Sequence, residues 1–196
     1  MLEIIFVRHG ETETNKKKLF SGWTNSKLTK KGIQQAEMVC EKLKNEKLNM
    51  IICSDLDRCL KTAQIINKHH GVNIIEEPGL REINFGKWEN LSYGEICEKY
   101  PEKSKKWEKD FVNFIFPDGE SLYQMYDRVN RAYKNIVKSC KNGKILIVSH
   151  SGVIRAILSQ EICKSIDGYW KFNIYNCGIA RLQYVDGFPV LIAVNQ

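Results

Sequence analysis

Two histidines in this chain follow strand-like runs of mainly apolar residues, at points where a buried strand would end. Residues 4–7 are followed by Arg8 and His9, and the run 145–149 is followed by His150. A neutral imidazole is a nucleophile, and the planar guanidinium of arginine donates paired hydrogen bonds to phosphate oxygens. The sequence therefore predicts a site that binds and attacks a phosphate-like anion.

A third stretch adds Arg58 to this group. The apolar residues 50–53 predict a short buried strand, and Arg58 lies in the first turn of the helix expected after it. The carboxyl ends of parallel strands meet at one edge of a sheet, where ligands bind in open α/β folds. The helix expected after His150 would direct backbone N–H groups and its positive dipole end to the same place. An ion pair of Arg58 with Asp55 or Asp57, and a purely structural His150, are the alternatives.

The elements that must position these residues follow the pattern of an α/β protein. A helix with Thr29 as its N-cap separates the first strand from the strand at 50–53, and a third strand is expected at 72–75. Ser54 and Asp57 fit a capping box for the intervening helix, which would run to about residue 70. Two successive strand–helix–strand units predict a mostly parallel sheet with right-handed crossovers. The other expected elements are a loop at 15–28, helices at 92–100, 102–111, 120–140 and 151–158, a strand at 144–149, and a hairpin of strands 179–184 and 189–194.

The length of 196 residues fits a single domain spanning 1–196. One stretch, about 83–118, breaks the alternation of strands and helices and is rich in aromatic and charged residues. We interpret this 83–118 segment as a small helical lid over the edge of the sheet.

Composition and cysteine spacing place limits on the environment of the protein. The mean hydropathy is −0.37, and the longest apolar runs hold about five residues, whereas a membrane span needs about 18. Met1 leads directly into the first predicted strand, so we expect no signal peptide and a cytoplasmic location. The seven cysteines contain no Cys-x-x-Cys pair, which favours reduced thiols and argues against a zinc site.

The net charge of +7 raises the possibility of nucleic-acid binding. Only seven of the 30 basic residues are arginine, and the lysines lack the interleaved aromatic residues of a base-stacking surface. We therefore expect a small anionic substrate and neither a nucleic-acid nor a membrane partner. The sequence is compatible with a monomer or a homodimer.

A series of motifs in fixed order resembles the histidine phosphatase superfamily, the phosphoglycerate mutase-like proteins. The resemblance begins at Arg8-His9-Gly10-Glu11-Thr12 and covers the whole chain. The other motifs are Asn15, Phe20-Ser21-Gly22-Trp23, the stretches 28–36, 53–58 and 80–89, Gly119-Glu120-Ser121, and Val148-Ser149-His150-Ser151-Gly152-Val153-Ile154-Arg155. The family fold that this resemblance implies has three α/β/α layers around a mostly parallel central sheet, with a small helical lid.

The resemblance also implies a role for each matching residue. His9 would be the nucleophile and form a phosphohistidine, while Glu82 would protonate the leaving oxygen and then activate water. The expected phosphate ligands are Arg8, Arg58 and His150, and the expected substrate-binding residues are Asn15, Ser21, Gly22, Ser151 and Tyr93. No metal or other cofactor is required if the arginines supply the positive charge. The family often has glycine at position 151, and we expect activity to survive the serine because its backbone donor remains.

Phosphatase activity is favoured over mutase activity because residues 82–119 contain no arginine that could hold a second phosphate. The compact length, the motif Phe85-Gly86-Lys87-Trp88-Glu89 and Trp170-Lys171-Phe172 are most similar to α-ribazole phosphatases, so the best guess for the substrate is α-ribazole 5′-phosphate. The candidates to pack on its base are Trp23 and the lid aromatics Tyr93, Tyr100, Trp107 and Phe111, with ordinary packing inside the lid as the alternative. A broad-specificity phosphatase for sugar phosphates or phosphoglycerates and a cofactor-dependent phosphoglycerate mutase are the enzymatic alternatives. A non-catalytic module that binds phosphate or RNA is the alternative from a different class.

Overall fold

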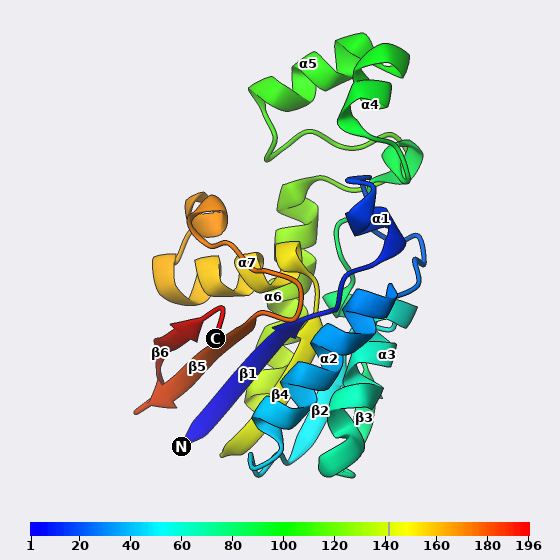
Figure 1. Ribbon diagram of the computed structural model, residues 1–196. Helices are drawn as coiled ribbons and strands as arrows, with labels where there is room; N and C mark the ends of the chain where they lie inside the picture. Colours follow the sequence, from blue (N-terminus) through cyan, green and yellow to red (C-terminus); the bar gives the residue numbers. More distant parts are fainter. Residues whose placement is uncertain (141) are drawn as a thin grey trace.

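A six-stranded sheet forms the centre of the computed structural model, which describes residues 1–140 and 142–196 (Figure 1). The strand order is β3-β2-β4-β1-β5-β6. The strands are β1 Leu2–Arg8, β2 Met50–Cys53, β3 Ile74–Glu76, β4 Gly143–Ser149, β5 Ile179–Val185 and β6 Phe188–Val194. The first four in spatial order are parallel, and the hairpin β5–β6 is antiparallel, so the predicted mostly parallel sheet is confirmed.

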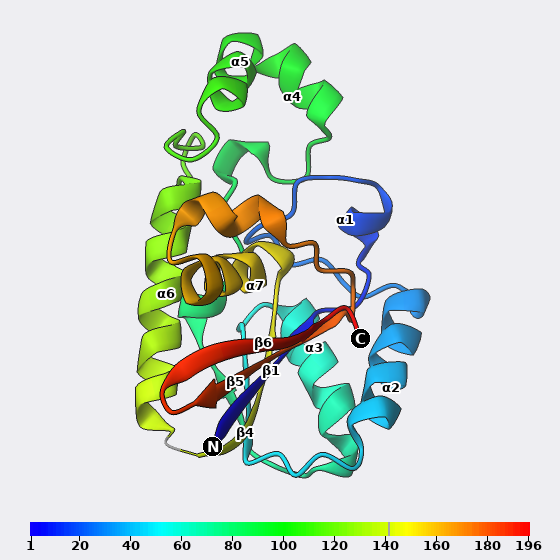
Figure 2. The same cartoon turned by 90° about the vertical axis from the view of Figure 1, so that its left-hand side faces the viewer.

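Helices cover both faces of the sheet, as Figures 1 and 2 show. Helices α2 and α3 lie on one face, and α6 and α7 lie on the other. The helices are α1 Glu13–Lys16, α2 Lys30–Leu43, α3 Asp57–Ile66, α4 Tyr93–Lys99, α5 Pro101–Lys109, α6 Leu122–Ser139 and α7 Ser151–Leu158. Single 3-10 turns occupy Asn67–His69, Pro78–Leu80 and Gly86–Trp88, a longer one occupies Ile166–Lys171, and a π-helical turn occupies Ser159–Cys163.

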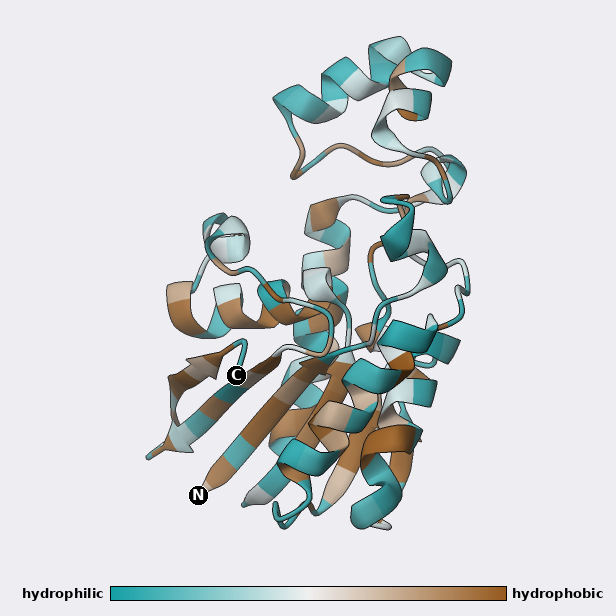
Figure 3. Ribbon diagram, in the orientation of Figure 1, coloured by the Kyte–Doolittle hydropathy of each residue, from teal (hydrophilic) through white to brown (hydrophobic). Residues whose placement is uncertain are grey.

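The alternation of side chains along β1 creates two hydrophobic layers. Ile4 and Phe6 pack in the layer beneath α6 and α7, whereas Ile5 and Val7 pack in the layer beneath α2 and α3. All four are completely buried. A strand buried on both faces is typical of a parallel sheet covered on each side, and this arrangement confirms the three-layer α/β/α prediction. Figure 3 shows the same pattern, with apolar strands inside and polar outer helix faces.

Within the 83–118 segment, α4 and α5 lie beyond the carboxyl ends of the parallel strands (Figure 1). This segment shares the hydrophobic layer of α6 and α7 through the fully buried Trp88. The indole of Trp88 has aromatic neighbours with ring centroids 5.1–6.4 Å away, namely Phe20, Tyr100, Trp107, Phe114 and Phe116.

Most predicted boundaries lie within a few residues of the observed ones, but the start of α3 is different. Ser54 does not cap α3: Leu56 is the N-cap, without a side-chain hydrogen bond. The Ser54 hydroxyl instead bonds His150 Nε2 at 3.0 Å, because the end of β2 places it next to that ring. The helix also ends at Ile66 rather than near residue 70, and the predicted loop at 15–28 is preceded by the short helix α1.

The predicted N-cap Thr29 is confirmed, and Ser92 caps α4 in the same way, each accepting a backbone hydrogen bond in the first turn of its helix. The seven cysteines are free thiols. None of the helices formed by residues 1–140 and 142–196 has the length and apolar character that crossing a membrane requires.

Candidate active site

The adjacent ends of β2, β4 and β1 bring His9 and His150 together. The backbone N–H of His9 donates to the carbonyl of Ser149 at 2.9 Å, which ties the end of β1 to the end of β4. The two imidazoles meet edge to face with their centroids 5.2 Å apart, and both are buried. The sequence prediction that the two histidines converge is therefore confirmed.

The hydrogen bonding of His9 fixes which ring nitrogen is available. His9 Nδ1 lies 2.8 Å from the carbonyl oxygen of Gly10, and a carbonyl can only accept. Nδ1 therefore carries the proton in the neutral ring, and Nε2 keeps its lone pair. Burial holds the pKa of His9 well below its usual value, and the charges of Arg58 and Arg8 lower this pKa further. The ring is thus neutral and nucleophilic at ordinary pH.

Arg58 contacts His150 rather than the aspartates beside it in the sequence. Its Nε donates to His150 Nδ1 at 3.3 Å, and the residue is 1% exposed. Asp55 instead binds Arg81, with Arg81 Nε donating to Asp55 Oδ1 at 2.7 Å. Burial and the Arg58 charge also hold the pKa of His150 well below its usual value. Among the described residues Arg58 pairs with neither Asp55 nor Asp57, so the alternative of such a surface ion pair is excluded.

The loop after α1 fixes the guanidinium of Arg58 from the other side. Arg58 donates to the carbonyl oxygens of Gly22, at 2.5 Å, and Thr24, at 3.0 Å. The carboxylate of Glu89 in turn accepts backbone N–H bonds from Gly22, Trp23 and Thr24 at 2.8–3.3 Å. A chain of polar contacts therefore runs from Glu89 through this loop to Arg58.

Arg8 and Ser21 contribute polar atoms that lack protein partners among the described residues. Arg8 Nη1 donates to the carbonyl of Ile174 at 2.8 Å, but its buried Nε has no hydrogen-bond partner. The buried Ser21 Oγ also has none. Buried polar groups are nearly always hydrogen-bonded, and a bound oxyanion would supply the missing acceptor for such donors.

The side chain of Glu82 lies against the N-terminus of α7, the helix that follows His150. Its carboxylate accepts from the backbone N–H groups of Gly152 and Ile83, each at 3.0 Å. Its charge lies close enough to the guanidinium of Arg8 to influence the pKa of that group. The ion pair of Arg81 with Asp55 keeps Arg81 from pairing with Glu82. Glu82 thus faces the positively charged cluster without an ion pair to Arg81.

The other predicted substrate-binding residues divide into two sets. Asn15 lies near His9: its side-chain oxygen accepts from Asn176 Nδ2 at 3.2 Å, and that Nδ2 also lies 3.1 Å from the His9 carbonyl. Ser151 is the first residue of α7 and follows His150 directly. Tyr93 is not brought into this group, because its hydroxyl bonds Glu108 within the 83–118 segment.

An apolar pocket of about 210 Å³ adjoins the Glu82 end of the site. Ile83, the neighbour of Glu82, lines it, and so does Tyr169, whose hydroxyl would lie 2.7 Å from a Cβ added to Gly152. The remaining lining residues are Phe20, Phe85, Trp107, Phe111, Phe116, Leu122 and Trp170. Of the lid aromatics that are candidates to pack on a base, Trp107 and Phe111 line this pocket, and Tyr93 and Tyr100 do not.

Three residues of the site were not predicted from the sequence: Tyr169, Asn176 and Glu89. Tyr169 and Asn176 come from the irregular region between α7 and β5, where no periodic pattern indicates which side chains point inward. Glu89 belongs to the recognised stretch 80–89, and its acidic side chain beside Trp88 was the available signal.

In the part of the chain that the structure describes, the cluster around His9 holds no trio of metal-ligating side chains with closely spaced ligand atoms. The arrangement instead combines a neutral imidazole nucleophile, two arginines and a carboxylate. These are the groups needed to transfer a phosphoryl group to His9 and to handle the proton of the leaving group.

Comparisons with known proteins agree with this chemistry. The family model described as the histidine phosphatase superfamily (branch 1) matches residues 4–196. Phosphoserine phosphatase 1 of Hydrogenobacter thermophilus is 29% identical over 195 residues, which cover all of this chain and 92% of the relative. The "Probable phosphoglycerate mutase GpmB" of Yersinia pestis is 32% identical, covering 94% of this chain and 86% of the relative. The crystal structure of the α-ribazole phosphatase from Shigella flexneri superposes with a TM-score of 0.95 at 27% identity, covering 99% of this chain and 96% of that structure.

Proposed function

Because the chain belongs to branch 1 of the histidine phosphatase superfamily, we propose that it is a phosphomonoesterase acting through a phosphohistidine on His9. The observation that carries the proposal is the His9 imidazole, which holds its proton on Nδ1 and lies beside the buried guanidinium of Arg58. The proposed reaction requires no metal, because Arg8 and Arg58 supply the positive charge.

In the first step, His9 Nε2 attacks phosphorus and the bond between phosphorus and the leaving oxygen breaks. Glu82 gives its proton to that oxygen, so the product leaves as an alcohol. Arg8 and Arg58 stabilise the charge on the transferring phosphoryl oxygens, and the backbone N–H groups at the start of α7 add their dipoles. Asn15, Ser21, Gly22 and Ser151 are proposed to complete the phosphate-binding surface.

In the second step, Glu82 acts as a carboxylate and takes a proton from water. The water oxygen attacks phosphorus, the bond from phosphorus to Nε2 breaks, and inorganic phosphate leaves. His9 returns to its neutral form with the proton still on Nδ1, and Glu82 regains the proton that it gave away. One ester and one water are consumed in each cycle, and one alcohol and one phosphate are released.

For the substrate, we propose a phosphate ester with an aromatic or apolar leaving group, with α-ribazole 5′-phosphate as the best candidate. The support is the apolar pocket of about 210 Å³ beside Glu82, which is rich in aromatic rings. A planar base can stack on such rings. The lining residues carry no positive charge for a carboxylate, which disfavours phosphoserine or a phosphoglycerate as the preferred ester. The absence of arginine from residues 82–119 likewise disfavours mutase activity.

The proposed activity can be tested with p-nitrophenyl phosphate. We expect the wild-type protein to hydrolyse it equally well with and without EDTA, and His9→Ala to be inactive. Rapid quenching under alkaline conditions should trap acid-labile phosphate on the wild-type protein only. Hydrolysis by His9→Ala at the wild-type rate would refute the proposed nucleophile, and no turnover of any ester would support the non-catalytic module.

A panel of phosphate esters ranked by kcat/KM tests the substrate separately. The panel holds α-ribazole 5′-phosphate, phosphoserine, 3-phosphoglycerate and a sugar phosphate, with 2,3-bisphosphoglycerate added in a mutase assay. We expect α-ribazole 5′-phosphate to rank first. A preference for phosphoserine would contradict the proposed role of the apolar pocket while leaving the phosphatase assignment intact.

A further inference from the structure

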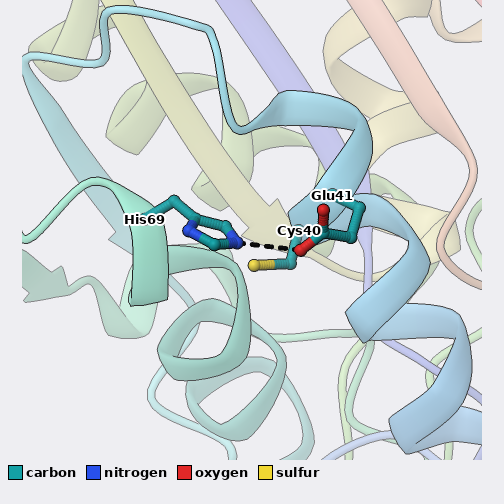
Figure 4. Close-up of side chains that lie close together, drawn as sticks. All are labelled: Cys40, Glu41 and His69. Atoms are coloured by element: carbon teal, nitrogen blue, oxygen red, sulfur yellow. Dashed lines mark hydrogen bonds and ion pairs between the residues drawn. The ribbon is translucent and has the colours of Figure 1, made fainter.

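A second cluster of reactive side chains lies between α2 and the turn that follows α3 (Figure 4). Cys40 and Glu41 are consecutive residues of α2, and His69 ends the 3-10 turn Asn67–His69. The thiol sulfur, a carboxylate oxygen and an imidazole nitrogen all lie within 4.8 Å of one another. The proposed phosphatase mechanism uses none of these residues.

We propose that Cys40, Glu41 and His69 form a binding site for a zinc ion, with water completing a tetrahedral shell. A thiolate, an imidazole and a carboxylate are the ligand types that zinc takes in proteins. Tetrahedral coordination with bonds of about 2.0–2.3 Å separates the ligand atoms by about 3.3–3.8 Å. The observed spacing therefore needs only small side-chain rotations to reach this geometry.

The surroundings allow those rotations and give the ion a path from solvent. Cys40 is buried, whereas Glu41 and His69 are partly exposed, with side-chain exposures of 61% and 35%. His69 Nε2 already lies 2.8 Å from Glu41 Oε1, so the two side chains point toward each other. An open pocket of about 470 Å³ reaches Cys40 and Glu41 from the surface.

To bind, the zinc ion must replace two existing side-chain contacts and displace the proton of the Cys40 thiol. The Cys40 Sγ lies 3.7 Å from the carbonyl of Ile66, and Glu41 also pairs with Lys44 at 3.2 Å. Burial raises the pKa of the Cys40 thiol, so the ion must displace its proton to bind the thiolate. The charges that line the pocket are balanced, with Glu37 and Glu41 opposite Lys61 and Lys68.

The site would add a metal-mediated link between two elements that already contact each other through side chains. Cys40 and Glu41 belong to α2, and His69 belongs to the segment after α3, so one ion would join both helices on the same face of the sheet. Because the unfolded chain does not preform this site, zinc binding stabilises the folded state. The inference does not depend on the phosphatase proposal, since binding can be measured without turnover.

The test uses the full-length protein after chelator treatment, in phosphate-free buffer with a reductant that does not bind metal. Zinc chloride is titrated by calorimetry, and cobalt chloride is titrated while the near-ultraviolet thiolate-to-cobalt charge-transfer band is recorded. We expect one zinc ion per chain, the charge-transfer band with cobalt, and a Tm that rises by several degrees with zinc.

The chain offers a neighbouring control for each exposed ligand. We expect Glu41→Gln and His69→Gln to weaken zinc binding by more than about 10-fold. Loss of a residue that only contacts a ligand already costs about 10-fold or more in metal affinity, and loss of a direct ligand should cost more. Glu37→Gln and His70→Gln should bind as the wild type does, because these neighbours lie outside the cluster. Cys40→Ser should abolish the charge-transfer band, while Cys97→Ser should keep it.

Three results would overturn the proposal. One is the absence of zinc binding at millimolar concentration, and another is a cobalt band that survives in Cys40→Ser. The third is equal affinity in Glu41→Gln, which replaces an exposed side chain and so tests the site without perturbing the core. Phosphatase activity measured in parallel separates this result from the proposed function, because the residues of the two sites differ.

Discussion

His9 and His150 are buried next to Arg58, and this placement disfavours the positively charged, doubly protonated form of either ring. Burial is the largest cause of the low pKa of each histidine, and the guanidinium charge of Arg58 adds to it. A phosphoryl group entering the site therefore meets two neutral imidazoles and two fixed positive charges. This arrangement favours anion binding without the competition of a proton for the attacking nitrogen.

The same shifts make the stability of the fold depend on pH. Both folded-state pKa values lie below the unfolded value near 6.5, so the unfolded chain binds more protons between those values. The contribution of these histidines to the free energy of unfolding is then at its maximum above pH 6.5, and it falls as the pH drops toward the folded-state pKa values. We expect a loss of up to about 1.4 kcal/mol per pH unit for each ring.

Urea unfolding between pH 5 and 8 measures this dependence. His9→Gln should show a smaller slope below pH 6.5 than the wild type, because it removes one of the two buried imidazoles. Equal slopes for the wild type and His9→Gln would contradict the burial argument. In the enzymatic assay, the acid limb of kcat/KM should lie below pH 6.5.

Gly152 is the residue at which the backbone of α7 comes closest to the proposed proton donor. A Cβ at this position would lie 2.3 Å from Glu82 Oε1 and 2.7 Å from the Tyr169 hydroxyl. We therefore expect Gly152→Ala to displace Glu82 and to lower kcat by about 10²-fold or more, as small misplacements of catalytic groups do.

The matched change is Gly94→Ala in α4, where an added Cβ meets open space. This variant should keep wild-type kcat and should fold normally. A circular dichroism spectrum and a Tm close to wild type would show that Gly152→Ala is folded. Unchanged kcat in a folded Gly152→Ala would rule out the position assigned to Glu82.

Residues at strand ends could be predicted from the hydrophobic pattern, whereas Glu82, Ser21 and Gly22 lie in irregular segments and were indicated only by the family resemblance. His9, Arg58 and His150 follow or flank buried apolar runs, and the adjacency of parallel strands places their ends together. Tyr169 and Asn176 reach the same site from a stretch without periodic hydrophobicity. Ser54 was assigned to a helix cap because its local spacing fits one, but the long-range contact with His150 takes its hydroxyl instead.

At the scale of elements, the loop after α1 connects the 83–118 segment to Arg58. Glu89 binds the backbone N–H groups of this loop, and the carbonyl oxygens of Gly22 and Thr24 bind Arg58. An anionic acceptor makes these hydrogen bonds stronger than neutral ones. We therefore infer that Glu89 positions Arg58 in the proposed phosphate site by holding the loop between them.

Glu89→Gln should loosen this loop, because the amide loses the charge and half of the acceptor capacity. We expect kcat/KM for p-nitrophenyl phosphate to fall by about 10-fold, equivalent to about 1.4 kcal/mol of transition-state stabilisation. Glu95→Gln removes a carboxylate that caps α4 and touches no part of the loop, and it should leave kcat/KM unchanged. Equal effects of the two substitutions would indicate a general loss of stability rather than a positioning role.

The element pattern was predictable where the hydrophobic period is regular. The long helix α6 and strands β1 and β4 were placed within a few residues, since each buries a continuous face. The short helix α1 was missed because four residues are too few to display a period. The antiparallel hairpin was predicted from its turn at Asp186 and Gly187, and both residues adopt positive φ there.

Over the whole molecule, one hydrophobic layer joins the sheet to the 83–118 segment. Trp88 is the largest of its fully buried side chains and contacts aromatic rings from several parts of this layer. Its indole N–H is buried and lacks a hydrogen-bond partner among the described residues. The packing of the ring therefore makes the stabilising contribution, and the unpaired N–H lowers it.

We expect Trp88→Ala to reduce the free energy of unfolding by about 3–5 kcal/mol, because it leaves a large cavity among aromatic side chains. Trp88→Phe should cost less than half of that, since it keeps most of the ring and removes an unsatisfied donor. Urea denaturation of both variants measures the difference. A larger loss for Trp88→Phe than for Trp88→Ala would mean that the indole N–H has a role that its surroundings do not reveal.

The hydrogen bond between His9 Nδ1 and the Gly10 carbonyl also has a stereochemical consequence. It ties up the ring atom nearer the backbone and leaves only the distal atom with an unshared pair. Any electrophile entering this pocket, whether a natural ester or an acylating reagent, would thus be directed to a single position. The adduct would be the tele regioisomer in every case, because the pros position is closed by the main chain itself.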